Sequence, residues 1–210
     1  MKLIILILYI SLFAGYVNAK DSTKVYPFPV ELLVGQKGTV YKTTYYKQIL
    51  NSSFKLFNLT TYQTNYGTVT DSYFIKAVVY YDLPKGFSIG SGVNLISGTS
   101  AKPLLSGMYS LFTKNVGFVI QPGYEIHKDG VFEVFSFYKY TASKFKKLNP
   151  YFKMSAFTSF KSGHSYSFLN LRVGLKYKSF IVGPAINTDF FGQEFSASSN
   201  YGGFLSFLIH

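Results

Sequence analysis

The sequence predicts an all-β fold, an up-and-down antiparallel transmembrane β-barrel of about ten strands, with about twelve as the alternative. Three observations lead to this prediction. Apolar and polar residues alternate along many segments, which is the period of a strand. These segments are longer than the roughly 5 to 6 residues of a typical soluble strand and match the roughly 9 to 11 that cross a bilayer at a tilt. The chain is 20% aromatic and only 14% charged, whereas soluble proteins average about 25% charged residues.

The alternation is clearest between residues 167 and 178. One face of this segment consists of Ser167, Leu169, Leu171, Val173, Leu175 and Tyr177, and the other of Phe168, Asn170, Arg172, Gly174, Lys176 and Lys178. Successive side chains of a strand point to opposite faces, so this strand has one apolar face and one cationic face. Residues 87–95 and 116–126 repeat the pattern. After residue 19 no apolar run approaches the roughly 20 residues of a spanning helix, which excludes a helical membrane protein.

Turn-forming residues separate the predicted strands. The ten strands are expected at about 53–63, 71–82, 86–97, 104–113, 116–127, 131–141, 150–161, 165–178, 180–190 and 200–210. Pro122 and Pro184 fall inside two of them, on the apolar register. Interior prolines are normally confined to edges and bulges. These two strands are therefore predicted to bulge at the prolines, or else to have different boundaries.

The first nineteen residues have the organisation of a signal peptide. Lys2 supplies a positive start, Leu3 to Phe13 form an apolar run, and Val17-Asn18-Ala19 is a small-residue cleavage site. The apolar run is too short for a spanning helix, which needs roughly 20 residues. Residues 1–19 are thus predicted to be removed after Ala19. The chain has no cysteine, so neither lipidation of a new amino-terminal cysteine nor a disulfide framework is expected.

Residues 20–52 precede the first strand that the pattern identifies. Pro27 and Pro29 suggest an extended lead-in, but the stretch from Glu31 to Gly35 and the later tyrosines are too apolar for a free tail. Three interpretations remain open. The segment is a plug whose Glu31 meets cations in the lumen, a periplasmic tail, or an additional strand pair that brings the count to about twelve, because thirty-odd residues can hold two short strands.

The last segment carries a family resemblance. Tyr201, Gly203, Leu205, Phe207 and Ile209 alternate up to the end of the chain, which resembles the terminal strand that the barrel-assembly machinery recognises in outer-membrane proteins. That family usually ends in an aromatic residue, where this chain has His210. Over its whole length the chain resembles the small outer-membrane β-barrel proteins of Gram-negative bacteria, which are porin-like and often uncharacterised.

The resemblance implies a location in the outer membrane, with lipid, lipopolysaccharide and the assembly machinery as partners. An even strand number returns the carboxyl terminus to the side of the amino terminus, so both ends of the barrel (residues 53–210) are expected in the periplasm. The periplasmic turns would then be residues 83–86, 113–115, about 144–147 and 178–179. The outer loops would be residues 64–70, 98–103, 128–130, 162–164 and 192–199.

Residues for catalysis or metal binding are few. The histidines are His127, His164 and His210, each near a predicted strand end. His164 has Ser162 and Ser165 beside it, but the spacing matches no catalytic motif. The absence of cysteine and of a His-x-x-x-His pair argues against a structural zinc site. The prediction is no enzyme, no catalytic residue, no metal and no cofactor.

Charge is the one signal that points into the lumen. The chain carries 21 Lys and Arg against 9 Asp and Glu, a net charge of +12. The residues expected to line the lumen are Lys76, Glu125, Glu133, Lys139, Lys153, Asn170, Arg172 and Lys176. An open basic lumen would favour small anionic solutes. Alternatively, the cations pair with Glu125, Glu133, Asp82 and Asp189 or lie at the rims. Nucleic acid is not an expected partner, since the lysines are dispersed.

Three functions follow from these features. The favoured prediction is a narrow channel or small-solute binder with a basic lumen, because a barrel of about ten or twelve strands lies between the filled small barrels and the open porins. The second is a structural or envelope-integrity barrel with a core filled by side chains. The third is an outer-membrane enzyme that acts on lipids through His127 or His164.

Overall fold

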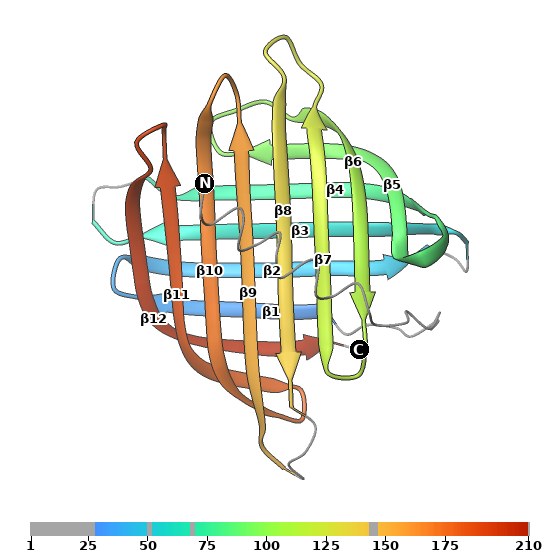
Figure 1. Cartoon of the computed structure of the whole chain (residues 1–210). Helices are drawn as coiled ribbons and strands as arrows, with labels where there is room; N and C mark the ends of the chain where they lie inside the picture. The colour runs from blue at the N-terminus through green and yellow to red at the C-terminus, as the bar shows by residue number, and fades with distance from the viewer. Residues whose placement is uncertain (1–27, 50–51, 68–69, 143–146, 210) are drawn as a thin grey trace.

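The computed structural model describes residues 28–49, 52–67, 70–142 and 147–209; the predicted signal peptide lies outside these ranges. They form a closed barrel of antiparallel strands (Figure 1). The strands are β1 (Phe28–Gly35), β2 (Gly38–Gln48), β3 (Phe54–Asn65), β4 (Ser72–Asp82), β5 (Phe87–Ile96), β6 (Lys102–Phe112), β7 (Val116–Glu125), β8 (Val131–Thr141), β9 (Asn149–Phe160), β10 (His164–Tyr177), β11 (Phe180–Phe191) and β12 (Ser196–Ile209). A single 3-10 turn, η2 (Pro84–Gly86), joins β4 to β5. No helix among the described residues is long and apolar enough to cross a membrane.

The ten predicted strands are present as β3 to β12. The largest boundary difference is at β12, which begins at Ser196 rather than 200. The provisional count of ten strands is wrong, and the alternative of twelve is confirmed, because residues 28–48 form the strand pair β1 and β2. The barrel therefore starts at Phe28 and not at 53, and the plug and tail interpretations are wrong for this segment. Threonines and tyrosines occupy much of β2 on both faces, which obscures its alternation in the sequence.

Each strand pairs with its sequence neighbours, and β1 closes the barrel by pairing with β12 from Phe28 opposite Ile209 to Gly35 opposite Gly202. In Figure 1 the strands at the front cross those at the back, as expected for tilted strands around a barrel. The connections lie at two rims. One rim, here called the terminal rim, contains the start of β1, the end of β12 and turns 83–86, 113–115 and 178–179. The opposite rim, here called the distal rim, contains turns 36–37, 97–101, 126–130, 161–163 and 192–195. This division agrees with the predicted grouping of turns and loops.

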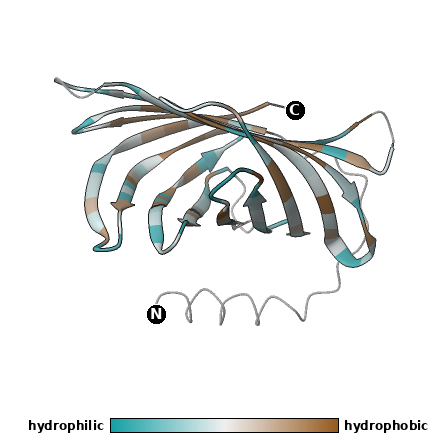
Figure 2. Ribbon diagram, turned by 90° about the horizontal axis from the view of Figure 1, so that it is seen from above, coloured by the Kyte–Doolittle hydropathy of each residue, from teal (hydrophilic) through white to brown (hydrophobic). Residues whose placement is uncertain are grey.

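The two faces of the barrel wall differ in character. Most buried side chains, such as those of Glu31, Lys76 and Arg172, point inward. The outward register of β10 and β11 includes Leu171, Val173, Leu175, Val182 and Ile186. Apart from Lys47 near the end of β2, the outward positions of the described strands carry no charged residue. Figure 2 shows hydrophobic and hydrophilic stretches succeeding each other along the strands. An uncharged outer face is what a strand in contact with lipid requires.

The two interior prolines do not bulge their strands. Pro122 lies on β7 opposite residues 107–108 of β6, where the ladder between these strands is interrupted. Pro184 lies on β11 opposite residues 173–174 of β10, and that ladder is interrupted in the same way. On both sides of each gap the register is unchanged. Proline lacks the N–H that a sheet hydrogen bond needs, so each proline removes backbone hydrogen bonds locally without shifting the register. The prediction of a bulge, or else of different strand boundaries, is therefore wrong.

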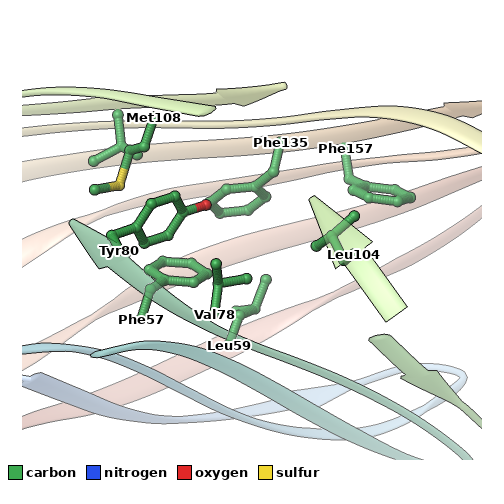
Figure 3. Packing of buried hydrophobic residues seen from close by; sticks show 9 residues of the cluster. Phe57, Leu59, Val78, Tyr80, Leu104, Met108, Phe135 and Phe157 are labelled. Atoms are coloured by element: carbon green, nitrogen blue, oxygen red, sulfur yellow. The ribbon is translucent and has the colours of Figure 1, made fainter. Parts of the chain in front are cut away.

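The middle of the lumen is filled by apolar side chains. A cluster of buried residues, here called the core plug, consists of Phe57, Leu59, Val78, Tyr80, Leu104, Met108, Val119, Phe135 and Phe157 (Figure 3). The Tyr80 hydroxyl lies 2.7 Å from Ser106 Oγ, so its polar end has a partner. The rings of Phe57 and Phe135 lie 6.0 Å apart. In this part of the lumen the apolar side chains are therefore packed against each other as in the core of a soluble protein.

The seam between β1 and β12 has a specific closure at the distal rim. The last paired residue of β1 is Gly35, so the distal part of β12 extends beyond it. Beyond Gly35 the Asn200 side chain of β12 forms hydrogen bonds to the backbone around the turn after β1. Its Oδ1 accepts from the Lys37 N–H at 2.9 Å, and its Nδ2 donates to the Gly38 carbonyl at 3.1 Å. A Cβ at Gly35 would lie 2.1 Å from Asn200 Oδ1. Glycine at 35 is what allows this amide to cover the edge of β12.

Candidate functional site

All eight residues predicted to line the lumen lie on the inward register of their strands. Lys76, Glu125, Glu133, Lys153 and Arg172 are buried, while Lys139, Asn170 and Lys176 are partly exposed. Seven of them belong to two ionic clusters or line two cavities, one cavity at each rim, whereas Lys176 belongs to neither cluster and lines neither cavity.

The first cluster, the Glu31 cluster, comprises Glu31, Lys42, Lys153 and Arg172. Glu31 is 2% exposed; its Oε2 lies 3.1 Å from Lys153 Nζ, and its Oε1 accepts from Arg172 Nε at 2.8 Å. Lys42 Nζ donates to Ser155 Oγ at 3.2 Å. The plug hypothesis thus placed Glu31 on the wrong kind of element, but its expectation that Glu31 meets lumenal cations is correct.

Glu31 offsets an unfavourable arrangement on the opposite wall. Lys153 on β9 lies directly opposite Lys139 on β8 and directly opposite Arg172 on β10. Like charges opposite each other on adjacent strands destabilise a sheet. The carboxylate of Glu31 reaches across from β1 to two of these three cations, so it ties the two walls of the barrel together.

The second cluster, the Glu133 cluster, comprises Lys76, Asn94, Glu125 and Glu133. Lys76 Nζ lies 2.5 Å from Glu133 Oε1, and both side chains are almost fully buried. Asn94 Nδ2 donates to Glu133 Oε2 at 2.7 Å and to Glu125 Oε1 at 2.9 Å. The amide bridges two carboxylates that would otherwise repel each other. Every charge of this cluster therefore has a hydrogen-bonded partner, which a buried ionic group requires.

The expectation that lumenal cations pair with carboxylates is correct in part. Lys76 pairs with Glu133, Lys102 with Glu125 and Lys55 with Asp82. Asp189 instead accepts a hydrogen bond from the Tyr166 hydroxyl at 2.6 Å. Within the described part of the chain, Lys42, Lys139 and Lys176 form no salt bridge.

The cavity at the terminal rim, the terminal cavity, has a volume of about 70 Å³. Its charged lining residues are Lys42, Lys139 and Lys153, without a carboxylate, and the remainder is largely aromatic: Phe28, Tyr46, Phe112, Phe135, Phe137 and Tyr151. The excess positive charge of the lumen therefore faces this rim. Its volume is far below the roughly 300 to 1,000 Å³ of typical ligand pockets, so it has room for little more than a small ion or one end of a larger molecule.

The cavity at the distal rim, the distal cup, has a volume of about 670 Å³, within the range of ligand pockets. Its walls carry hydroxyl and amide side chains: Thr61, Gln63, Asn65, Thr70, Ser72, Ser97, Ser159, Ser165, Asn170, Asn187 and Ser198. Its charges, Lys102, Lys161, Glu125, Glu133 and Asp189, are of mixed sign. Phe157 stacks on Phe168 at 5.6 Å and lies 5.6 Å from Phe74, which adds an aromatic surface.

Amides form a row along one wall of the cup. Asn170 on β10 lies opposite Asn187 on β11, which in turn lies opposite Asn200 on β12. Asn200 is engaged at the seam. The Asn187 Oδ1 atom is buried and has no hydrogen-bond partner among the described residues. Buried polar atoms are normally paired, so this oxygen is a candidate acceptor for a ligand. Asn170 was predicted from the sequence to line the lumen, whereas Asn187 was not, although both lie on inward positions.

Two histidines lie at the distal rim. His127 Nε2 lies 3.3 Å from Glu125 Oε2, and its Nδ1 accepts from the Asp129 N–H. His164 contacts the Gly192 carbonyl and Ser167 Oγ, not Ser162 or Ser165, the serines noted in the sequence. The third histidine, His210, lies outside the described residues.

Comparison with known proteins bears on the fold alone. No protein-family model matches the sequence, and no curated protein matches it. The solved structure of the NanC porin superposes with a TM-score of 0.52 at 10% identity, covering 87% of this chain and 99% of NanC. The structure of LpxR from Salmonella typhimurium superposes with a TM-score of 0.44 at 8% identity, covering 86% of this chain and 99% of LpxR. The superposition on NanC thus supports the closed antiparallel barrel fold of this chain.

Proposed function

We propose that this protein is an outer-membrane barrel that binds a small polar solute in the distal cup and does not conduct ions through an open pore. In this proposal both chain ends lie at the periplasmic rim, and the cup opens to the outside. The observation that carries the proposal is the division of the lumen. The distal cup and the terminal cavity share no lining residue, and the core plug with its nine buried residues occupies the lumen.

The lining of the cup favours an uncharged, polyhydroxylated solute. Hydroxyl and amide groups supply both donors and acceptors, and the rings of Phe74, Phe157 and Phe168 offer an apolar surface for the C–H face of such a molecule. The charged groups there are of both signs and largely paired, so they do not select for anions. The preference for anionic solutes predicted from net charge applies better to the terminal cavity.

A purely structural barrel would also have a filled core, so the cup is what separates the two functions. A barrel that serves only envelope integrity needs no open polar cavity of about 670 Å³. A structural role predicts that the refolded protein binds no solute at any of the concentrations tested.

Two measurements on the refolded full-length chain test the proposal. In planar bilayers we expect no conductance steps; regular steps with anion selectivity would overturn the closed lumen and favour a channel. Isothermal titration calorimetry with glucose, N-acetylglucosamine and maltose is expected to detect binding of at least one sugar, with inorganic phosphate as the anionic comparison. Binding of none of the sugars would overturn the assignment of the cup.

A variant pair locates the site. Asn187→Leu should weaken sugar binding about tenfold, the effect of losing a hydrogen bond worth roughly 1 to 1.5 kcal/mol. Thr188→Val is the matched control, because Thr188 is the next residue of β11 and its side chain points outward. Equal effects of the two substitutions would show that binding occurs elsewhere.

A further inference from the structure

A serine and a histidine lie in contact on the outer surface of the barrel, at the distal rim and outside the lumen. His164 Nε2 lies 2.7 Å from Ser167 Oγ, and His164 Nδ1 lies 2.6 Å from the Gly192 carbonyl oxygen. Such a pair, with the base oriented by a third group, is the arrangement of an activated nucleophile. Neither solute binding nor the fold accounts for it.

A β-bulge creates this contact. Residues three apart in a regular strand point to opposite faces, so His164 and Ser167 would ordinarily be separated by the barrel wall. The register between β9 and β10 shifts by one residue between His164 and Tyr166, with His164 opposite Phe160 and Tyr166 opposite Ser159. The extra residue places His164 on the same face as Ser167. Bulges are common next to active sites because they re-aim a side chain in this way.

The protons of the pair can be assigned from its partners. A carbonyl oxygen only accepts, so His164 Nδ1 carries the proton that is donated to Gly192. In the neutral imidazole Nε2 is then an acceptor, 2.7 Å from Ser167 Oγ. The Ser167 hydroxyl donates to Thr158 Oγ1 at 2.7 Å, and rotation about the Cβ–Oγ bond of Ser167 turns this proton to His164 Nε2. The base thus lies within reach of the serine proton, as a general-base mechanism requires.

The histidine ring is held in place by the neighbouring turn. It stacks on Phe195 with ring centroids 3.9 Å apart and planes 19° apart. Phe195 has a φ of 54°, in the left-handed region that phenylalanine rarely adopts. The Gly192 carbonyl that orients His164 also accepts the Phe195 N–H at 3.2 Å. Strain of this kind persists where the surroundings impose it, often at functional sites.

The surroundings of the pair indicate the class of substrate. Ser167 lies between Thr158 of β9 and Phe190 of β11 on the outward register. The next outward residues along β10 are Leu169, Leu171 and Val173, which begin the uncharged face of the barrel. We propose that Ser167 and His164 are the nucleophile and general base of an esterase that cleaves acyl-ester bonds of membrane lipids reaching the distal rim. This activity goes beyond solute binding. It departs from the prediction that the chain is no enzyme and develops the alternative of a lipid-acting enzyme that uses His164.

The reaction needs only the lipid and water. Ser167 Oγ attacks the ester carbonyl carbon while its proton passes to His164 Nε2. The bond from that carbon to the alcohol oxygen breaks, the alcohol takes the proton from Nε2, and the acyl group remains on Ser167 Oγ. A water molecule then attacks the acyl carbon and gives its proton to Nε2, which returns it to Ser167 Oγ as the fatty acid leaves. The sum is ester plus water to acid plus alcohol.

The test uses the refolded full-length chain in mixed micelles with diacyl phosphatidylethanolamine. We expect release of fatty acid and covalent labelling by a fluorophosphonate, with the adduct mapped to Ser167 by mass spectrometry. Ser167→Ala and His164→Asn should each lower the hydrolysis rate about a thousandfold or more, and both should abolish labelling. Ser136→Ala is the matched control, since Ser136 is also an outward-facing serine, on β8, and has no histidine contact among the described residues.

Each outcome decides the proposal. Labelling at Ser167 with fatty-acid release supports it. Absence of both from folded protein, or labelling that persists in Ser167→Ala, overturns it. Labelling at Ser167 without lipid hydrolysis overturns the lipid as substrate. Heat-modifiable gel migration shows whether each variant is folded, and labelling of the unaltered protein requires no variant at all.

Discussion

Removing the charge of Glu31 should destabilise the barrel strongly, because this carboxylate pairs with two buried cations. In Glu31→Gln the side chain keeps its shape, but Lys153 and Arg172 lose the anion that each contacts at 2.8 to 3.1 Å. Breaking a buried ion pair by removing one partner costs about 3 to 5 kcal/mol. Lys153 lines the terminal cavity, where water can hydrate its ammonium group. We therefore expect a loss near the lower end of that range, about 3 kcal/mol of unfolding free energy.

Guanidinium unfolding of the detergent-refolded chain, followed by far-ultraviolet circular dichroism, measures this loss. Glu194→Gln is the control, because Glu194 is exposed in turn 192–195 and a surface change of this kind should stay within about 0.5 kcal/mol. The double variant Glu31→Gln with Lys153→Met should lose less unfolding free energy than the sum of the two single losses, because Lys153 is no longer present as a cation without its carboxylate. The difference, which is the coupling energy of the pair, should be about 0.5 to 3 kcal/mol. Strict additivity, or an unchanged midpoint for Glu31→Gln, would refute the cross-lumen role of this carboxylate.

Three further predictions concern the wall, the core plug and the distal rim. Gly92→Ala should lower the unfolding free energy by about 1 to 3 kcal/mol, because the added Cβ would lie 2.0 Å from the Ala77 carbonyl oxygen. Gly107→Ala is the control: its Cβ would contact only Pro122, at 3.8 Å, so the unfolding free energy should stay unchanged in the same assay. Phe135 belongs to the core plug and lines the terminal cavity, so Phe135→Ala should open a path from this cavity into the rest of the lumen and produce conductance steps in planar bilayers. Phe132→Ala, which removes an outward-facing ring from the same strand, should produce no conductance steps. If neither variant conducts, residues other than Phe135 block the lumen. Asp129→Asn should not move the unfolding midpoint at neutral pH, because Asp129 and its partner Lys161 are both exposed and such a pair contributes little stability; a clear shift would contradict this. The hydrogen bond and charge of Lys161 lower the pKa of Asp129. Any stabilisation by the pair is therefore present above the ordinary carboxylate pKa and is lost as the pH falls through the lowered value.

Period-two alternation explains which features were predictable from the sequence. It located β3 to β12 and assigned Lys76, Lys153 and Arg172 to the inward face, because both inferences need only the parity of a residue within its strand. Contacts across the lumen depend on how far each strand is staggered around the barrel, which no local pattern reveals. The pairing of Glu31 with Lys153 and Arg172 was therefore not predictable as such.

The Ser167–His164 contact was missed for a related reason. Because successive side chains of a strand alternate between its two faces, residues three apart are expected on opposite faces. The sequence around Ser165 contains no unambiguous signal for the bulge that places His164 and Ser167 on the same face. Sequence proximity therefore pointed only to Ser162 and Ser165, the serines close to His164 in the chain. The strands β1 and β2 could not be assigned from the sequence, because thirty-odd residues with few turn signals are compatible with a tail, a plug or a strand pair.

The seam between β1 and β12 determines the order in which the barrel can assemble. Its partners, such as Phe28 and Ile209, are almost the whole described chain apart, and pairing at such separation is slow because the chain must first close a very long loop. Until that closure the strands form an open sheet with two long free edges, each able to pair with another chain. We therefore expect the pairing of β1 with β12, including the Asn200 amide, to be the last step of folding, and we expect a chain lacking β1 to keep free strand edges that can pair with other chains.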